Sequence, residues 1–119
     1  MGMTYKGTSP QPLDLTLKCA AWVADSLGYK PTFTQHGKTL EAVHKDSVLA
    51  PYEDGRQEKL TAAGAESVKN PGSSTFSVTA QTFSFKWTRI GLESQELPAS
   101  AKVKADAKTV AERCGGASE

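Results

Sequence analysis

The chain has 119 residues, enough for one domain with a single modest hydrophobic core. Its 14 basic and 13 acidic residues leave a net charge of +1, which argues against a surface that binds nucleic acid or another polyanion through charge. No apolar stretch approaches the roughly 20 residues of a membrane-spanning helix, and a hydrophobic fraction of 38% predicts a lean core.

The first 12 residues are polar and rich in Gly, Ser, Thr and Pro. This composition predicts a flexible segment, 1–12, ahead of a single domain over residues 13–116. The segment has neither the basic nor the apolar region of a signal peptide, and Met1-Gly2 ahead of Met3 suggests that a targeting segment has been removed. We expect contact with a membrane only through an anchor in such a missing segment.

A helix is predicted from Leu15 to Leu27, where apolar residues recur at steps of three and four. Asp14 or Thr16 can cap its start, and Gly28 fits the left-handed position that ends a helix. The predicted buried stripe consists of Leu17, Ala20, Val23, Ala24 and Leu27.

Trp22 lies roughly opposite the buried stripe of this helix. Two interpretations of it remain open. Trp22 is either a partly exposed anchor for a binding partner or a side chain that packs against a loop.

A β-hairpin is predicted next, with strands at 32–35 and 39–43 around a short turn that holds Gly37. The following residues, 47–74, are strongly polar, with weak helical character over 60–68. A segment of this length without clear structure predicts an excursion from the compact domain, either functional or mobile.

Two strands with alternating apolar residues follow the excursion. In the first strand the apolar positions are even-numbered, and in the second they are odd-numbered, so a register break is expected near residues 80–82. The alternating residues are Phe76, Val78 and Ala80 in the first strand, and Phe83, Phe85 and Trp87 in the second.

A connector at 91–98 and a final helix capped by Ser100 complete the chain. The apolar stripe of that helix is formed by Val103, Ala107, Val110 and Cys114. Together these elements predict an α+β fold. We expect a two-layer sandwich in which the N- and C-terminal helices lie on one face of a mostly antiparallel sheet of about four strands.

Cys19 and Cys114 are the only cysteines, and each lies on or beside the apolar stripe of a terminal helix. A structural zinc site needs four ligands, but the chain has only two cysteines, and neither a CxxC nor an HxxxH spacing occurs. No metal or cofactor is therefore expected. Two separate reduced cysteines in the core are one alternative. The favoured interpretation is a disulfide, which predicts a periplasmic or secreted location.

The enzyme motifs GxSxG, HExxH, GxxxxGK[ST] and GxGxxG are all absent from the sequence. The two histidines, His36 and His44, are the candidate acid or base groups for an enzyme, the least favoured alternative. The sequence therefore predicts a domain that is not an enzyme.

Aromatic residues supply the candidate binding surface. An alternating aromatic strand beside Lys86 and Arg89 could stack the bases of a single-stranded nucleic acid, but the neutral chain lacks the field that attracts phosphates. We therefore expect no nucleic acid as partner, and favour another envelope protein or a small apolar ligand. The candidate residues are Trp22, Phe76, Phe83, Phe85 and Trp87.

The two ends of the chain resemble those of small exported bacterial domains of uncharacterised function, which are often carried by lipoproteins. The resemblance rests on Cys19, Leu27-Gly28-Tyr29, the segment 101–107 and Arg113-Cys114-Gly115, about a third of the chain. It implies a location in the cell envelope and a disulfide, and it transfers no catalytic residues. The expected function is a non-catalytic extracytoplasmic domain that binds a protein or ligand.

Overall fold

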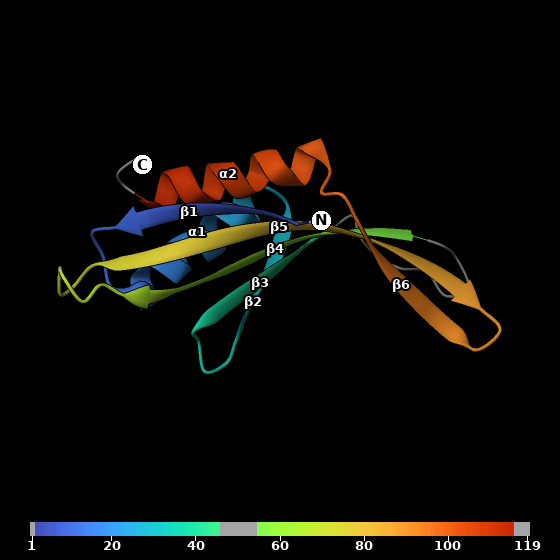
Figure 1. The fold of residues 1–119 in the computed structure, drawn as a ribbon, viewed down its shortest axis with the longest axis horizontal. Helices are drawn as coiled ribbons and strands as arrows, with labels where there is room; N and C mark the ends of the chain where they lie inside the picture. The colour runs from blue at the N-terminus through green and yellow to red at the C-terminus, as the bar shows by residue number, and fades with distance from the viewer. Residues whose placement is uncertain (1, 46–54, 116–119) are drawn as a thin grey trace.

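The computed structural model describes residues 2–45 and 55–115, which form two helices and a six-stranded antiparallel sheet (Figure 1). The predicted α+β fold with an antiparallel sheet is confirmed, but the sheet has six strands instead of about four. In chain order the elements are β1 (Met3–Ser9), α1 (Leu13–Ser26), β2 (Tyr29–Thr34), β3 (Thr39–His44), β4 (Gly55–Glu66), β5 (Ser74–Thr88), β6 (Gly91–Leu97) and α2 (Ala101–Gly115).

The strands are ordered β1-β5-β4-β3-β2, and β6 also pairs with β5. β1 pairs with residues 74–80 of β5, whereas β6 pairs with residues 82–88. The two outer strands therefore follow one another along the same edge of β5. The 15-residue β5 is the longest strand and joins the two halves of the sheet.

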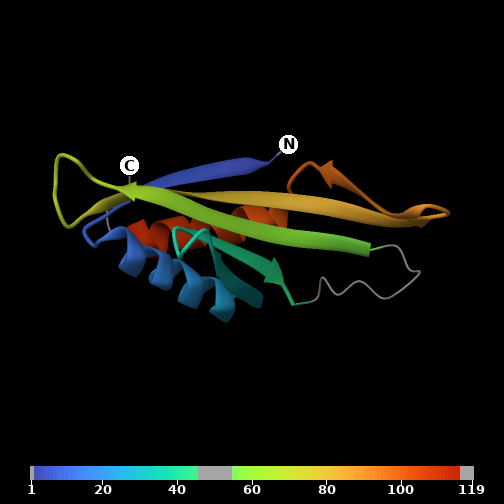
Figure 2. The same cartoon turned by 90° about the horizontal axis from the view of Figure 1, so that it is seen from below.

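Both helices lie on the same side of the sheet (Figure 2). We call that side the covered face and the other side the open face. The core forms between the helices and the covered face. Its buried apolar residues include Leu17, Ala20, Val23 and Ala24 of α1, Leu40 and Ala42 of β3, Leu60 and Ala62 of β4, Phe76, Val78 and Ala80 of β5, and Val103, Ala107, Val110 and Cys114 of α2.

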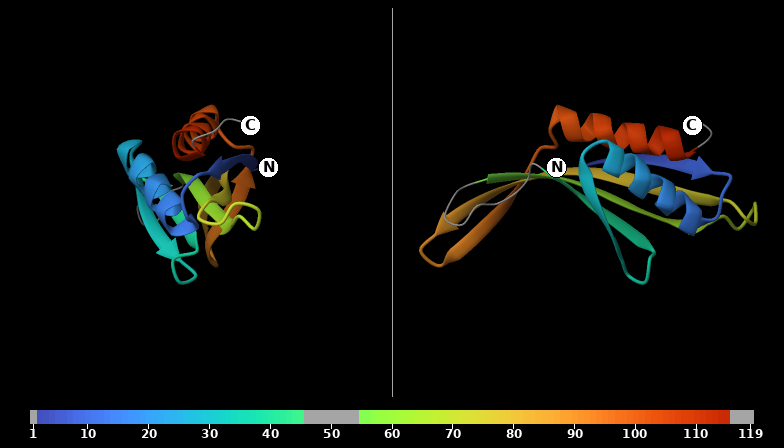
Figure 3. Two further views of the ribbon diagram at one scale, coloured as in Figure 1. Left: turned by 90° about the vertical axis from the view of Figure 1, so that its left-hand side faces the viewer. Right: turned by 180° about the vertical axis from the view of Figure 1, so that it is seen from behind.

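One end of the sheet extends past both helices (Figures 1 and 3). We call this three-stranded extension the arm; it consists of residues 55–58 of β4, residues 82–88 of β5, and β6. The remaining elements form the body. Because of the arm the molecule is elongated, with extents of 53 × 28 × 23 Å.

A polar network joins the base of the arm to α2. The Glu58 carboxylate accepts hydrogen bonds from the hydroxyls of Thr82 (2.6 Å) and Ser100 (3.0 Å). The Thr82 hydroxyl accepts one from the Ser100 backbone N–H (3.0 Å). Ser100 also caps α2 as predicted, since its hydroxyl accepts a hydrogen bond from the Val103 N–H (3.2 Å).

The flexible segment predicted at 1–12 is wrong, because Met3–Ser9 form β1. Only Met3 and Tyr5 alternate with polar residues in this strand, a pattern too short to identify a strand in the sequence. Its pairing with β5, from Met3 opposite Ala80 to Ser9 opposite Ser74, supplies the backbone hydrogen bonds that hold it in place.

Three expectations for the second half of the chain are also wrong. Residues 60–68 are not helical, since most of them belong to β4; the connector at 91–98 is mostly β6. Small residues in β4 and polar residues in β6 masked the strand signals. The expected register break near residues 80–82 is absent, because β5 pairs with β4 in one continuous register. The 47–54 part of the expected excursion lies outside the described residues.

The predicted first helix is confirmed in position but not in its N-cap. Pro12 occupies the N-cap position, and the Leu13 N–H donates to a carboxylate oxygen of Glu66 on β4 (2.9 Å). The Thr16 hydroxyl instead turns into the core, where it donates to the Ser9 hydroxyl (2.8 Å). At the other end Gly28 adopts a φ of 97°, as a helix-ending glycine predicts.

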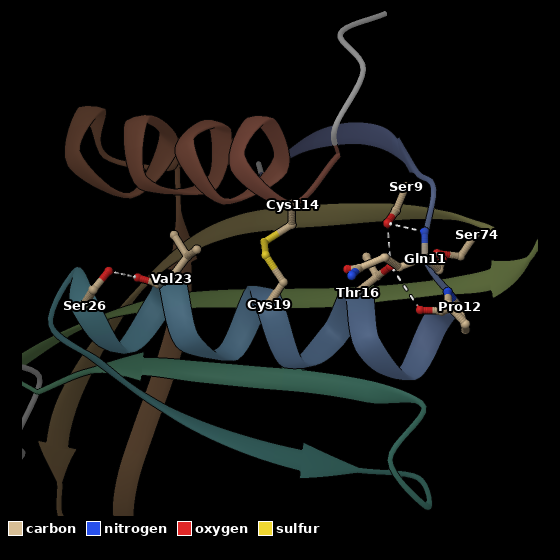
Figure 4. Close-up of a disulfide and its surroundings, with 9 residues drawn as sticks. All are labelled: Ser9, Gln11, Pro12, Thr16, Cys19, Val23, Ser26, Ser74 and Cys114. Carbon is tan, nitrogen blue, oxygen red and sulfur yellow. Dashed lines mark hydrogen bonds between the residues drawn. A yellow bond between two sulfur atoms is a disulfide. The ribbon is translucent and has the colours of Figure 1, made fainter. Parts of the chain in front are cut away.

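Cys19 and Cys114 form the expected disulfide, which ties α1 to α2 (Figure 4). Their Cα atoms are 5.8 Å apart, and they are separated by 95 positions in the sequence. Such a bond is compatible with an oxidising compartment outside the cytoplasm. Neither α1 nor α2 is long and apolar enough to cross a membrane.

Candidate binding surface

The apolar positions of β5 change sides of the sheet where the arm begins. Successive side chains of a strand point to opposite faces, and β5 contains no bulge. Phe76 and Val78 therefore point to the covered face, whereas Phe83 and Phe85 point to the open face. The change of parity in the sequence reflects a change in which face is apolar, without a break in the strand.

The aromatic platform consists of Phe83, Phe85 and Trp87, which share the open face of the arm and are each half-buried. Alternate residues of a strand are about 6.6 Å apart, so the three side chains form a row about 13 Å long. The structure thus places three of the five candidate residues side by side on the strand face that the helices do not cover.

Hydrogen-bonding side chains flank the platform at the base of the arm. The strand register places Phe83 between Gln57 of β4 and Glu96 of β6. On the same face, the Gln81 amide donates to the Glu96 carboxylate over 3.5 Å. An amide and a carboxylate therefore stand on either side of the first ring.

The side chains that flank Phe85, in the middle of the platform, are smaller than those beside Phe83. Phe85 lies between Gly55 and Ser94, and Trp87 lies beside Leu92. A glycine and a serine leave space next to the Phe85 ring. The platform is therefore polar at its base, open in the middle and apolar at its tip.

The cationic strand residues of the arm lie on its other face. Strand alternation places Arg56 and Lys86 on the side opposite the platform. Lys59 does share the open face, just below the arm, but its amine is 2.6 Å from a Glu41 carboxylate oxygen. The surroundings of the platform are therefore neutral to acidic, which disfavours a phosphate-bearing ligand.

Phe76 does not belong to this surface. It is 4% exposed and packs in the core between glycines on both neighbouring strands, Gly7 of β1 and Gly64 of β4. A methyl group added at Gly64 would lie only 2.8 Å from the Phe76 Cα. The prediction that Phe76 belongs to the binding surface is therefore wrong, because the even-numbered side chains of β5 face the helices.

Trp22 is exposed, with 68% of its surface accessible, which favours the anchor interpretation over packing against a loop. It lies on the outer side of α1, whose inner side is buried against the sheet. Because α1 is on the covered face, the structure does not bring Trp22 to the aromatic platform. Trp22 is a separate exposed aromatic residue.

Sequence reasoning missed a hollow of about 440 Å³ on the open face of the body. It forms where β1, β5 and β4 carry small residues next to one another. Runs of Ala and Gly in β4 were the only available signal. The open-face side chains around the hollow are Lys6, Thr8, Ala63, Ala65, Thr75 and Ser77.

The two histidines lie at opposite ends of the β2–β3 hairpin. His36 is exposed in the turn, with a φ of 59°, whereas His44 ends β3. The His44 ring packs edge-on against Tyr29, with centroids 4.9 Å apart. The structure does not bring the two candidate acid or base groups together.

Tyr29 anchors a second polar cluster under α2. Its hydroxyl is buried and donates to Asp106 (2.7 Å), which also pairs with Lys102 (2.8 Å). Burial raises the pKa of Tyr29 well above its ordinary value, and the hydrogen bond to Asp106 and the charges of Asp106 and Glu58 raise this pKa further. The arrangement keeps Tyr29 neutral and holds α2 on the sheet.

Among the described residues, no three His, Cys, Asp or Glu side chains converge as a metal site would require. Comparisons of the chain with protein-family models, curated proteins and solved structures find no match. The candidate surface is therefore defined by its own geometry, with the aromatic platform as its centre.

Proposed function

We propose that this chain is a non-catalytic binding domain that acts outside the cytoplasm and recognises its ligand on the aromatic platform. The observation that carries the proposal is the position of Phe83, Phe85 and Trp87 on the face that the helices do not cover. In this view the body is a two-layer sandwich that stabilises the domain, and the arm presents the binding surface.

Contact between the platform rings and water is unfavourable in the free domain, and this supports a binding role. Aromatic rings are usually buried against the core, and apolar rings gathered on one accessible surface commonly mark an interaction site. Here the core is complete without them, since both helices pack on the other face. A ligand that covers the rings would remove their apolar surface from water.

The disulfide supports the proposed location. It lies between the two helices that cover the core, where its removal would loosen the body. Disulfides of this kind persist in secreted and periplasmic proteins and are rare in the cytosol. Another envelope protein or a small ligand is therefore the kind of partner that we expect.

Nuclear magnetic resonance with a mixed library of sugars, short peptides and apolar small molecules tests this proposal. Signals of the backbone amides of residues 55–58 and 83–87 are expected to shift together with at least one compound. Phe85→Ala should abolish these shifts, whereas the matched variant Ser84→Ala, which changes the other face of the same strand, should retain them. Shifts that cluster around Trp22 or the hollow instead, or no shifts at all, would contradict the proposal.

A further inference from the structure

We infer that the aromatic platform binds an uncharged oligosaccharide, a ligand class that rests on the proposed function and makes it specific. The inference follows from three features of the open face of the arm. These are the spacing of the rings, the hydrogen-bonding side chains beside them and the distribution of charge.

The row of rings suits a linear ligand with repeating units. Phe83, Phe85 and Trp87 follow one another along one strand at intervals of about 6.6 Å. The face of an aromatic ring carries partial negative charge and attracts the weakly positive C–H groups of a sugar ring. A chain of sugars laid along β5 can therefore stack successive rings on the platform.

The polar flanks match the hydroxyl groups of such a ligand. Gln57 offers amide donors and an acceptor on one side of Phe83, and Glu96 offers carboxylate acceptors on the other. A purely apolar partner would bury these groups without new hydrogen bonds, which costs free energy. Sugar hydroxyls can donate to and accept from both groups.

The distribution of charge argues for a neutral ligand over an anionic one. Glu96 is the charged side chain that borders the platform directly, while Arg56 and Lys86 lie on the opposite face. Lys59 is already paired with Glu41. Along the strands of the arm, a nucleic acid or an acidic polysaccharide would meet the Glu96 carboxylate and no lysine or arginine on the platform side. The open-face lysines Lys6 and Lys30 lie on β1 and β2, outside the arm.

Tryptophan fluorescence provides a direct test, because the chain has two tryptophans and only Trp87 belongs to the platform. In the full chain carrying Trp22→Phe, Trp87 becomes the single reporter. We would titrate this protein with chitohexaose, cellohexaose and maltohexaose. The comparison probes are a short oligothymidylate and an amphipathic peptide. A saturable change in emission with at least one of the neutral sugars is the expected result.

Variants then locate the binding. Phe85→Ala should weaken the binding of the sugar about tenfold, the upper range for one aromatic contact. Gln57→Ala and Glu96→Ala should weaken it as well, and they serve as the readout if Phe85→Ala does not fold. Lys86→Ala, on the opposite face, is the matched control and should leave the affinity unchanged.

The outcomes separate the ligand class from the proposed function. Saturable binding of only the peptide or the oligothymidylate, lost in Phe85→Ala, would overturn the inference and leave the platform as a binding site. No response of Trp87 to any probe, or a response unaffected by all three platform variants, would overturn both.

Discussion

The body and the arm of this protein use the same strand in opposite ways. In the body, β5 points Phe76 and Val78 at two helices that bury them. In the arm, the same uninterrupted strand points Phe83 and Phe85 at the other face. The comparison shows that one continuous strand can serve stability in its first half and present a surface in its second half.

The body also holds the covalent link, and its loss should have the largest effect. Replacing both cysteines in Cys19→Ala/Cys114→Ala opens a loop spanning 95 positions. In the chain-entropy model such a loop contributes about 4.7 kcal/mol, so the free energy of unfolding in urea should fall by up to that amount. Reductant should destabilise the parent protein and leave the double variant unaffected. An unchanged midpoint in the parent would contradict the disulfide.

Two phenylalanines on β5 allow a direct test of the comparison. Phe76→Ala should lower the free energy of unfolding by about 3–4 kcal/mol, since it creates a cavity in the core. Phe85→Ala, on the open face, should cost about 1 kcal/mol because its ring is only half-buried. Urea unfolding of the two variants measures both values. Equal losses would show that the rings of the arm belong to a second core.

Tyr29 makes the stability of the body sensitive to alkaline pH. Its pKa is raised in the folded protein above the value of about 10 expected in the unfolded chain. Its contribution is therefore fully present below about pH 10 and is lost as the pH rises further, since only the unfolded state then releases the proton.

Tyr29→Phe isolates this contribution. It removes the hydrogen bond to Asp106 and should cost about 1.5–2 kcal/mol at neutral pH. Above about pH 10 the difference in unfolding free energy between the parent and Tyr29→Phe should shrink. Urea unfolding at several pH values measures it, and a constant difference would exclude a role of the Tyr29 proton.

Trp22 should show the smallest effect. Because it is 68% exposed on the outer side of α1, Trp22→Phe is expected to change the free energy of unfolding by less than about 0.5 kcal/mol. Thermal unfolding followed by circular dichroism is sufficient for this comparison. A larger loss would mean that Trp22 supports the body, and it would then be unsuitable as the replaced residue in the fluorescence test.

The amino-acid sequence by itself determined both helices and the link between them. Their apolar residues repeat with the helical period, Gly28 adopts the predicted left-handed conformation, and Ser100 caps α2 as expected. These signals are local, because a helix makes its backbone hydrogen bonds within one segment. The cysteines on the two helix stripes then favoured the disulfide.

The tertiary structure alone decided the extent of the sheet and the face on which each aromatic residue lies. β1 and β6 are polar strands that exist through pairing with β5, and their partners are far away in the sequence. The sequence showed an alternating segment around Phe76 and another around Phe85. It did not show that a single unbroken strand contains both. The alternation in a strand assigns its residues to the two faces of the sheet. Only the position of the helices decides which of these faces is buried.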